Sequence, residues 1–254
     1  MLLCCRLSLV DMVYSQKENV FTNHEKGKTN MKIAITKNGP YIVDAGVPVK
    51  EVNSLANKDG AVLAYEEKKD LSDAKANTYL CRCGHSANKP FCDGHHAKIG
   101  FDGTETNDRK SYDHGAELLQ GKVYDALDKP ELCAAARFCD VGAGFWNALH
   151  SMDEADKKYV EHVACTCPSG RLTLVDKHTG QKMEPELEKE IYLVNDVPAG
   201  HLGPIYAKGG IQVTGADGFA YEVRNRVTLC RCGESRNLPF CDASHLRCEH
   251  MEVE

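Results

Sequence analysis

"CRCGESRNLPFCDASH" at Cys230–His245 repeats, with few changes, an earlier stretch of the same chain, "CRCGHSANKPFCDGHH" at Cys81–His96. Each copy holds a Cys-x-Cys pair, a proline, a third cysteine and a histidine at identical offsets. The histidine follows the third cysteine by four positions, so one helical turn brings both side chains to the same side. We therefore expect each copy to gather three thiolates and one imidazole: Cys81, Cys83, Cys92 and His96 in the first, and Cys230, Cys232, Cys241 and His245 in the second.

This ligand set suits two kinds of metal centre. Three thiolates and one imidazole complete a tetrahedral zinc site. They can equally hold a [2Fe–2S] cluster, with the Cys-x-Cys pair on one iron and the remaining Cys and His on the other. The spacing of the residues leaves both alternatives open.

Both stretches resemble the CDGSH (NEET-type) iron–sulfur motif, in which a C-x-C pair, a Ser or Thr and a Pro precede Cys-Asp-Gly, a small residue and His. The first copy departs from the motif at His95, which replaces the small residue, and the second at Ala243, which replaces the Gly. Neither departure falls on a ligand. The resemblance implies one redox-active [2Fe–2S] cluster in each copy, held by three Cys and one His.

The resemblance also bears on architecture, because members with one motif commonly pair as dimers of small β-rich folds. A chain with two motifs can form that pair internally, which predicts a pseudo-two-fold axis and either a monomer with internally paired motifs or a homodimer. The repeat extends to the strand-like "NGPYIVDAGVPVK" at Asn38–Lys50 and "LGPIYAKGGIQVT" at Leu202–Thr214. The first copy is longer, and we place its insertion within residues 53–76.

A segment between the copies carries four more cysteines, Cys133 and Cys139 in "ELCAAARFCD" and Cys165 and Cys167 in "ACTCPSGRL". A proline follows the last one, as in bacterial ferredoxin runs, but the usual C-x2-C-x2-C run is absent. The segment resembles divergent single-cluster ferredoxin-like domains, which have a C-x5-C pair and a later Cys-Pro-Ser-Gly. That resemblance implies a [4Fe–4S] or [3Fe–4S] cluster; the alternative is four buried free cysteines in a helical spacer.

These features predict an α+β, β-rich fold in which two small CDGSH-type β domains flank a short helical ferredoxin-like segment. Residues 1–30 are expected to be a poorly ordered extension, because charged residues interrupt its apolar run. We expect the first CDGSH-type domain at 31–105, the ferredoxin-like segment at 106–190 and the second CDGSH-type domain at 191–254. Within the middle segment, apolar residues recur at helical spacing over 153–163 and predict a helix.

The composition argues against several classes of partner. The chain has 254 residues, a net charge of −6 and no long run of Lys or Arg, so neither nucleic acid nor an anionic membrane is expected to bind it. No apolar stretch approaches the about 20 residues that span a bilayer. Most of its thirteen cysteines stand in tight groups and no secretion signal is evident, which indicates metal or cluster sites in a reducing compartment, the cytoplasm.

The sequence contains no nucleotide or flavin fingerprint and no Ser-His-Asp arrangement. We therefore expect a carrier of electrons or clusters and not an enzyme, with redox proteins or apo iron–sulfur acceptors as its partners. A lone imidazole ligand can be protonated, so the clusters are expected to be labile in acid. The alternatives are a zinc-stapled protein interaction module and a sensor that signals redox state or iron by losing its cluster.

Overall fold

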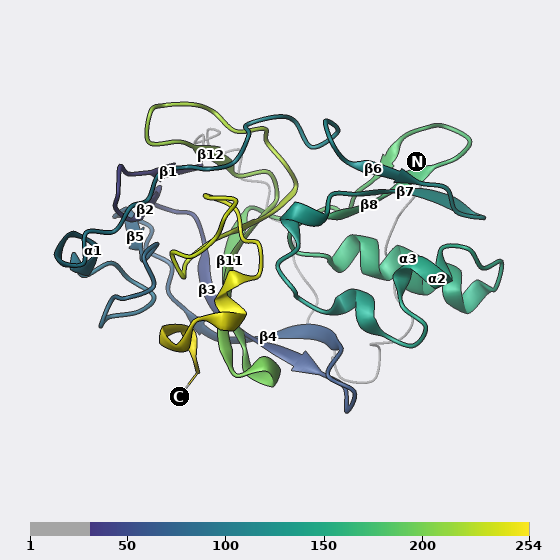
Figure 1. Cartoon of the computed structure of the whole chain (residues 1–254), viewed down its shortest axis with the longest axis horizontal. Coiled ribbons are helices and arrows are strands. Elements are labelled where there is room, and N and C mark those ends of the chain that lie inside the picture. The colour runs from purple at the N-terminus through teal and green to yellow at the C-terminus, as the bar shows by residue number, and fades with distance from the viewer. Residues whose placement is uncertain (1–30, 254) are drawn as a thin grey trace, which may run out of the picture.

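Three β-sheets and a few short helices make up residues 31–253, the part of the chain that the computed structural model describes (Figure 1). The extension expected over residues 1–30 lies outside the described residues. The expected α+β, β-rich class is confirmed. Among the described residues, no helix combines the length and the apolar character needed to cross a bilayer.

Two of the sheets carry the repeated motifs. The first has the strand order β12-β1-β2-β5, with bounds Gln212–Thr214 (β12), Lys32–Ile35 (β1), Tyr41–Val43 (β2) and Thr78–Leu80 (β5). The second has the order β13-β11-β10-β3-β4, with bounds Arg226–Leu229 (β13), His201–Lys208 (β11), Glu190–Asp196 (β10), Val49–Ala56 (β3) and Val62–Asp70 (β4). Strand β4 has no counterpart in the first sheet and lies within the predicted insertion.

The third sheet belongs to the middle segment, where the sequence predicts helices only. Its order is β6-β7-β8-β9, with bounds Glu117–Leu119, Tyr124–Asp128, Leu172–Asp176 and Lys182–Met183. The α-helices are α1 (His95–Lys98), α2 (Phe145–Ala148) and α3 (Glu154–Thr166). Five 3-10 turns complete the described fold: η1 (Pro130–Leu132), η2 (Phe138–Asp140), η3 (Val197–Ala199), η4 (Ser244–Arg247) and η5 (Glu249–Met251).

The two motif-bearing halves exchange a strand. Strand β12 of the second half pairs in parallel with β1 of the first, and β3 of the first half pairs in parallel with β10 of the second. In both sheets two antiparallel pairings then lead to the strand that enters the Cys-x-Cys pair. The orders β12-β1-β2-β5 and β3-β10-β11-β13 therefore correspond strand for strand, as an internal pseudo-two-fold requires. The domain limits at 105 and 190 stay a prediction.

One hydrophobic core spans both halves. Side chains of β1, β2 and β3 pack with those of β10, β11 and β12, all at most 4% exposed: Ile33, Tyr41, Val43, Val49, Ile191, Leu193, Ile205 and Val213. Fully burying a side chain of this size is worth about 1.5–3 kcal/mol. The two halves are therefore expected to unfold together.

The middle segment has its own core and is tied to the second half by an ion pair between a buried arginine and a partly exposed glutamate. Helix α3 begins where the Asp153 carboxylate accepts the Ala155 amide at 2.7 Å, which confirms the predicted helix. At its other end the fully buried Arg226 of β13 donates to the Cys167 carbonyl at 2.9 Å. Arg226 also makes hydrogen bonds of 2.7 and 2.9 Å to the Glu184 carboxylate.

Ile191→Ala tests whether the halves share a core. Ile191 is fully buried, so removing its side chain should lower the free energy of unfolding by about 2–5 kcal/mol. Thiol labelling during a denaturant titration should show the cysteines of both motifs becoming accessible in the same transition. Leu63→Ala, at an edge-strand side chain that is 49% exposed, should cost under about 0.5 kcal/mol. Loss of one site in Ile191→Ala while the other survives would contradict the shared core.

Glu184→Gln tests the contribution of the Arg226–Glu184 ion pair to stability through its pH dependence. Burial opposes ionisation of Glu184, but the hydrogen bonds and charge of Arg226 prevail and hold its pKa below the usual range. This contribution is complete above about pH 4.3 and is lost as the pH falls through the lowered pKa. The variant should lose about 1–3 kcal/mol at pH 7, a discounted figure because a third of the Glu184 side chain is exposed. In denaturant titrations the difference from wild type should shrink below pH 4; a constant difference would exclude the ion pair as its cause.

Candidate metal centres

The first ligand set, which we name site one, lies where β5 ends. The Leu80–Phe91 bridge and two backbone hydrogen bonds fold the chain back on the strand: the Cys81 amide donates to Pro90 at 2.8 Å, and the Cys92 amide donates to Tyr79 at 2.9 Å. The Sγ atoms of Cys81 and Cys83 are 3.8 Å apart. The Sγ of Cys92 lies 3.3 Å from Nδ1 of His96.

Polar side chains of the motif brace the loop of site one. The Ser86 hydroxyl donates to the Phe91 carbonyl at 2.6 Å. The Asp93 carboxylate accepts the backbone amides of Ala87 and His95, each at 2.9 Å. The motif's Ser and Asp therefore hold the backbone that presents the four ligands, and neither is needed as a ligand.

The second set, site two, reproduces this construction at the end of β13. The Cys230 amide donates to Pro239 at 2.9 Å, and the Sγ atoms of Cys230 and Cys232 are 3.5 Å apart. The Sγ of Cys241 lies 3.5 Å from Nδ1 of His245. The Ser and Asp of this motif, Ser235 and Asp242, repeat the bracing hydrogen bonds. Ala243, the departure from the motif, adopts the same left-handed backbone (φ 67°) as Gly94 (φ 82°) in site one, so the exchange leaves the turn intact.

The ligands in each site fall into two pairs. Among the described residues, no three His, Cys, Asp or Glu side chains converge on the position of a single ion. A mononuclear zinc site needs its four donors around one point, whereas a two-iron core takes two donors on each iron. Each pair has the spacing of two donors on one metal atom.

Ionisation of the paired thiols calls for a cation. The hydrogen bond between the two thiols lowers the pKa of Cys81 to about 5 and raises the pKa of Cys83. In site two, burial raises the pKa of Cys241 well above its usual range. All three thiols of such a site ionise together only when a positive charge, which iron supplies, lies among them.

A buried arginine stands between the first two cysteines of site one. Arg82 is 1% exposed and donates to the Gly103 carbonyl at 2.6 Å. Its Nε and Nη1 have no hydrogen-bond partner among the described residues. Its guanidinium lies over the rings of Tyr41 and Phe101, 5.8 and 5.3 Å from their centroids, and cation–π attraction offsets part of the cost of burying the charge. An Arg stands between the two cysteines in both copies, a signal that the sequence interpretation did not use.

Three of the four middle cysteines line the same cavity, and the fourth does not. One cavity of about 210 Å³ is lined by Cys133, Cys139 and Cys167. Ala136 and other residues of the 133–140 loop complete its lining, together with Arg171. We name it the middle cavity. Burial raises the pKa of Cys139 to about 12, and negative charge on Asp140, Cys167 and Cys133 adds to the shift. Cys165 is buried but is absent from the lining of the middle cavity.

Two family models match these regions. The one described as "Iron-binding zinc finger CDGSH type" matches residues 38–97 and 202–246. The one described as "Divergent 4Fe-4S mono-cluster" matches residues 119–177, which include all four middle cysteines. The chain thus contains two CDGSH-type regions. No curated protein and no solved structure was found to match it.

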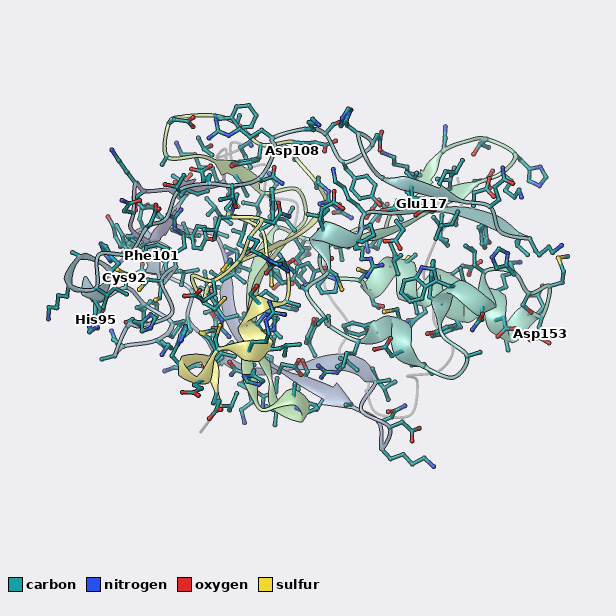
Figure 2. All side chains as sticks on the ribbon, viewed as in Figure 1. Cys92, His95, Phe101, Asp108, Glu117 and Asp153 are labelled. Atoms are coloured by element: carbon teal, nitrogen blue, oxygen red, sulfur yellow. The ribbon has the colours of Figure 1, made fainter. Side chains whose placement is uncertain are left out.

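The two CDGSH sites differ in how far the protein shields their cysteines and histidine from solvent. In site one, Cys92 and His96 are half-buried, and Cys92 lies at one end of the molecule in Figure 2. In site two, Cys241 is 3% and His245 2% exposed. The C-terminal turns η4 and η5 supply this cover, and the buried Cys248 and Met251 pack with Cys230 and Cys232.

Residues outside the motifs also support the double-CDGSH protein's sites. The buried Tyr41 of the first half donates its hydroxyl to the Cys230 carbonyl of site two at 2.7 Å. This hydrogen bond joins residues 189 positions apart, so no local pattern indicates it. Strand exchange brings β2 of one half to the ligand loop of the other.

An iron chelator should distinguish the two sites. We expect biphasic loss of the visible absorbance, with site one losing its cluster first, because water and chelator reach Cys92 and His96 directly. The rates should differ at least tenfold, which corresponds to about 1.4 kcal/mol of additional local opening free energy at site two. Cys92→Ala should remove the fast phase, and the matched Cys241→Ala should remove the slow one. Equal rates for the two single-site variants would show that the C-terminal turns do not protect site two.

Proposed function

We propose that the double-CDGSH protein transfers electrons and has no substrate chemistry of its own. In this proposal each CDGSH motif holds a [2Fe–2S] cluster through three Cys and one His. A further cluster occupies the middle cavity. The observation that carries the proposal is direct contact between the ligand loops of the two CDGSH sites.

That contact is made by backbone atoms. A Cβ atom added at Gly84 would lie 2.6 Å from the Cys232 carbonyl oxygen, and one added at Gly233 would lie 2.9 Å from that of Cys83. Both glycines also have positive φ (80° and 85°), which disfavours any other residue there. Ligand loops that touch support electron exchange between the two clusters, because electron tunnelling weakens steeply with distance.

Two histidines extend the contact between the sites. Nδ1 of His85 is 2.8 Å from the Cys83 carbonyl oxygen, and Nε2 of His250 is 3.0 Å from the Cys232 carbonyl oxygen. Their rings stack with centroids 4.1 Å apart. The stacked pair thus bridges one ligand cysteine of each site and adds a second route for an electron.

Site two also adjoins the middle cavity. Asn237, in the ligand loop of site two, donates to the Glu131 carbonyl at 3.0 Å, just before Cys133. Negative charge on Cys133 is among the causes that raise the pKa of Cys241, after burial and the charge on Cys230. Site two therefore lies between site one and the middle cavity, as the C-terminal turns do between α1 and α3 in Figure 1. This order supports a relay through the covered site.

The exposed edge of site one is the proposed docking surface for redox proteins. Tyr79 and Ile99, close in sequence to its ligands, are 49% and 44% exposed. Exposure of Cys92 and His96 also favours a second candidate function, delivery of the site-one cluster to an apo acceptor. No disulfide joins the described cysteines, and the proposed compartment is a reducing one, the cytoplasm.

Iron analysis and electron spin resonance test the proposal. Protein purified without oxygen should contain iron and acid-labile sulfide in equal amounts at the CDGSH sites and should be red-brown. In the reduced form, spins on sites one and two should couple and broaden each other's signals. Cys92→Ala should leave one narrow signal from site two, and Cys241→Ala one from site one.

Two results would refute the proposal. Colourless protein that contains zinc, prepared with ample iron, would favour the zinc-stapled interaction module. Reduced wild-type spectra that equal the sum of the two single-site spectra would exclude close exchange between the sites.

A further inference from the structure

The spacing of the middle cysteines leaves one ligand position empty. The bacterial ferredoxin run places cysteines at every third position, C-x2-C-x2-C, and adds a later Cys-Pro. Here Cys133 and Cys139 occupy the first and third positions of such a run, and Cys167-Pro168 supplies the later ligand. Ala136 stands at the second position. A methyl group cannot bind iron.

The structure agrees with this alignment and separates Cys165 from the other three cysteines. Ala136 lines the middle cavity beside Cys133, Cys139 and Cys167. Cys165 lies within α3, whereas Cys167 is the residue that caps this helix. Residues two apart on a helix project about 200° apart, so Cys165 faces away when Cys167 faces the cavity.

Oxygen donors at the cavity do not replace the missing thiolate. Asp140 lines the cavity but is exposed, and its carboxylate lies 3.7 Å from the Cys139 sulfur. Ser169 is buried, but its hydroxyl lies 3.6 Å from the Cys167 sulfur and accepts the Arg171 amide at 3.3 Å. Each oxygen donor therefore lies beside a cysteine that is already a proposed ligand, and neither supplies the ligand that is missing at position 136.

Two guanidinium groups of the wall are each fixed by a carboxylate that balances their charge. Arg171 is held by hydrogen bonds of 2.6 and 2.9 Å to Asp128, and Arg137 by 2.6 and 2.7 Å to Asp196. Both arginines line the cavity. The cavity volume of about 210 Å³ is below the about 300–1,000 Å³ usual for organic ligands, so a compact inorganic group fits better than a substrate.

We infer that the middle cavity holds a three-iron [3Fe–4S] cluster on Cys133, Cys139 and Cys167, and that Cys165 is not a ligand. The matching family model is described as a four-iron mono-cluster; with Ala136 between Cys133 and Cys139, a fourth iron would have no thiolate ligand in this cavity. This inference rests on the proposed function only in requiring that a cluster occupies the middle cavity.

Spin resonance of the oxidised full-length protein provides the test. Oxidised [2Fe–2S] and [4Fe–4S] cores have no net spin in their ground states, whereas an oxidised [3Fe–4S] core does, so the middle cluster is observed alone. Purification must exclude oxygen, because four-iron clusters lose an iron on oxidation. We expect an oxidised-state signal and three irons beyond those of the CDGSH sites.

Four variants assign the ligands. Cys165→Ser should keep the signal and the iron content, and Cys133→Ser should lose both. Ala136→Cys should abolish the signal and gain one iron, because it supplies the fourth thiolate. Cys81→Ser is the control: it should remove iron from site one and leave the oxidised signal unchanged. Retention of the CDGSH clusters in Cys133→Ser reports that this variant has folded.

The outcomes separate this inference from the proposed function. Loss of the signal in Cys165→Ser, or a silent wild-type spectrum with or without middle iron, would overturn the three-thiolate assignment while leaving the CDGSH clusters in place. An Ala136→Cys spectrum identical to wild type would also overturn it. Absence of iron from sites one and two as well would refute the proposed function itself.

Discussion

Buried thiols that must ionise together are the constraint on which this structure depends. Sites one and two each place two thiols within 4 Å of each other, and all three thiols of site two are at most 3% exposed. Without a cation, one thiolate of a pair raises the pKa of the other, and burial raises both. With iron present, the same burial becomes useful because it excludes water from the cluster.

Strand exchange is the device that brings the two sites together. A pair of independent CDGSH domains could drift apart on the linker between them. Here β3 completes the sheet of the second half and β12 that of the first, so separating the sites would disrupt both sheets and the shared core. The Tyr41 hydroxyl on the Cys230 carbonyl shows the consequence at atomic level, since a residue of one half positions the ligand loop of the other. The close approach at Gly84 and Gly233 is therefore maintained by the core of the whole molecule.

Local pattern and long-range packing set what the sequence could predict. The pairing of Cys92 with His96 follows from spacing, because side chains four residues apart meet on one helical turn. The pairing of Cys81 with Cys83 follows from their closeness in the chain, and the bend at residues 82–84 brings the two sulfurs to 3.8 Å. The helix predicted over 153–163 follows from apolar periodicity, and the structure places it at Glu154–Thr166. The sequence did not predict the sheet of the middle segment, because its strands are short and β7 is separated from β8 by a long connection. Strand exchange could not be predicted from local sequence either, because the residue patterns of β3 and β12 indicate strands without indicating which sheet they join.

The same distinction applies to the middle cysteines. Counting cysteines in the sequence treats Cys165 and Cys167 alike, and only the end of α3 between them tells them apart. The helix presents Cys165 to the interior, away from the lining of the middle cavity. The residue after the helix is free to turn toward the cavity, because Pro168 prevents the helix from continuing. The ligand set of this cavity is thus decided by where a helix stops, while the ligand sets of the two CDGSH sites are decided by the spacing of their residues. A cluster site can therefore be recognised from its cysteines, but its nuclearity depends on backbone geometry around them.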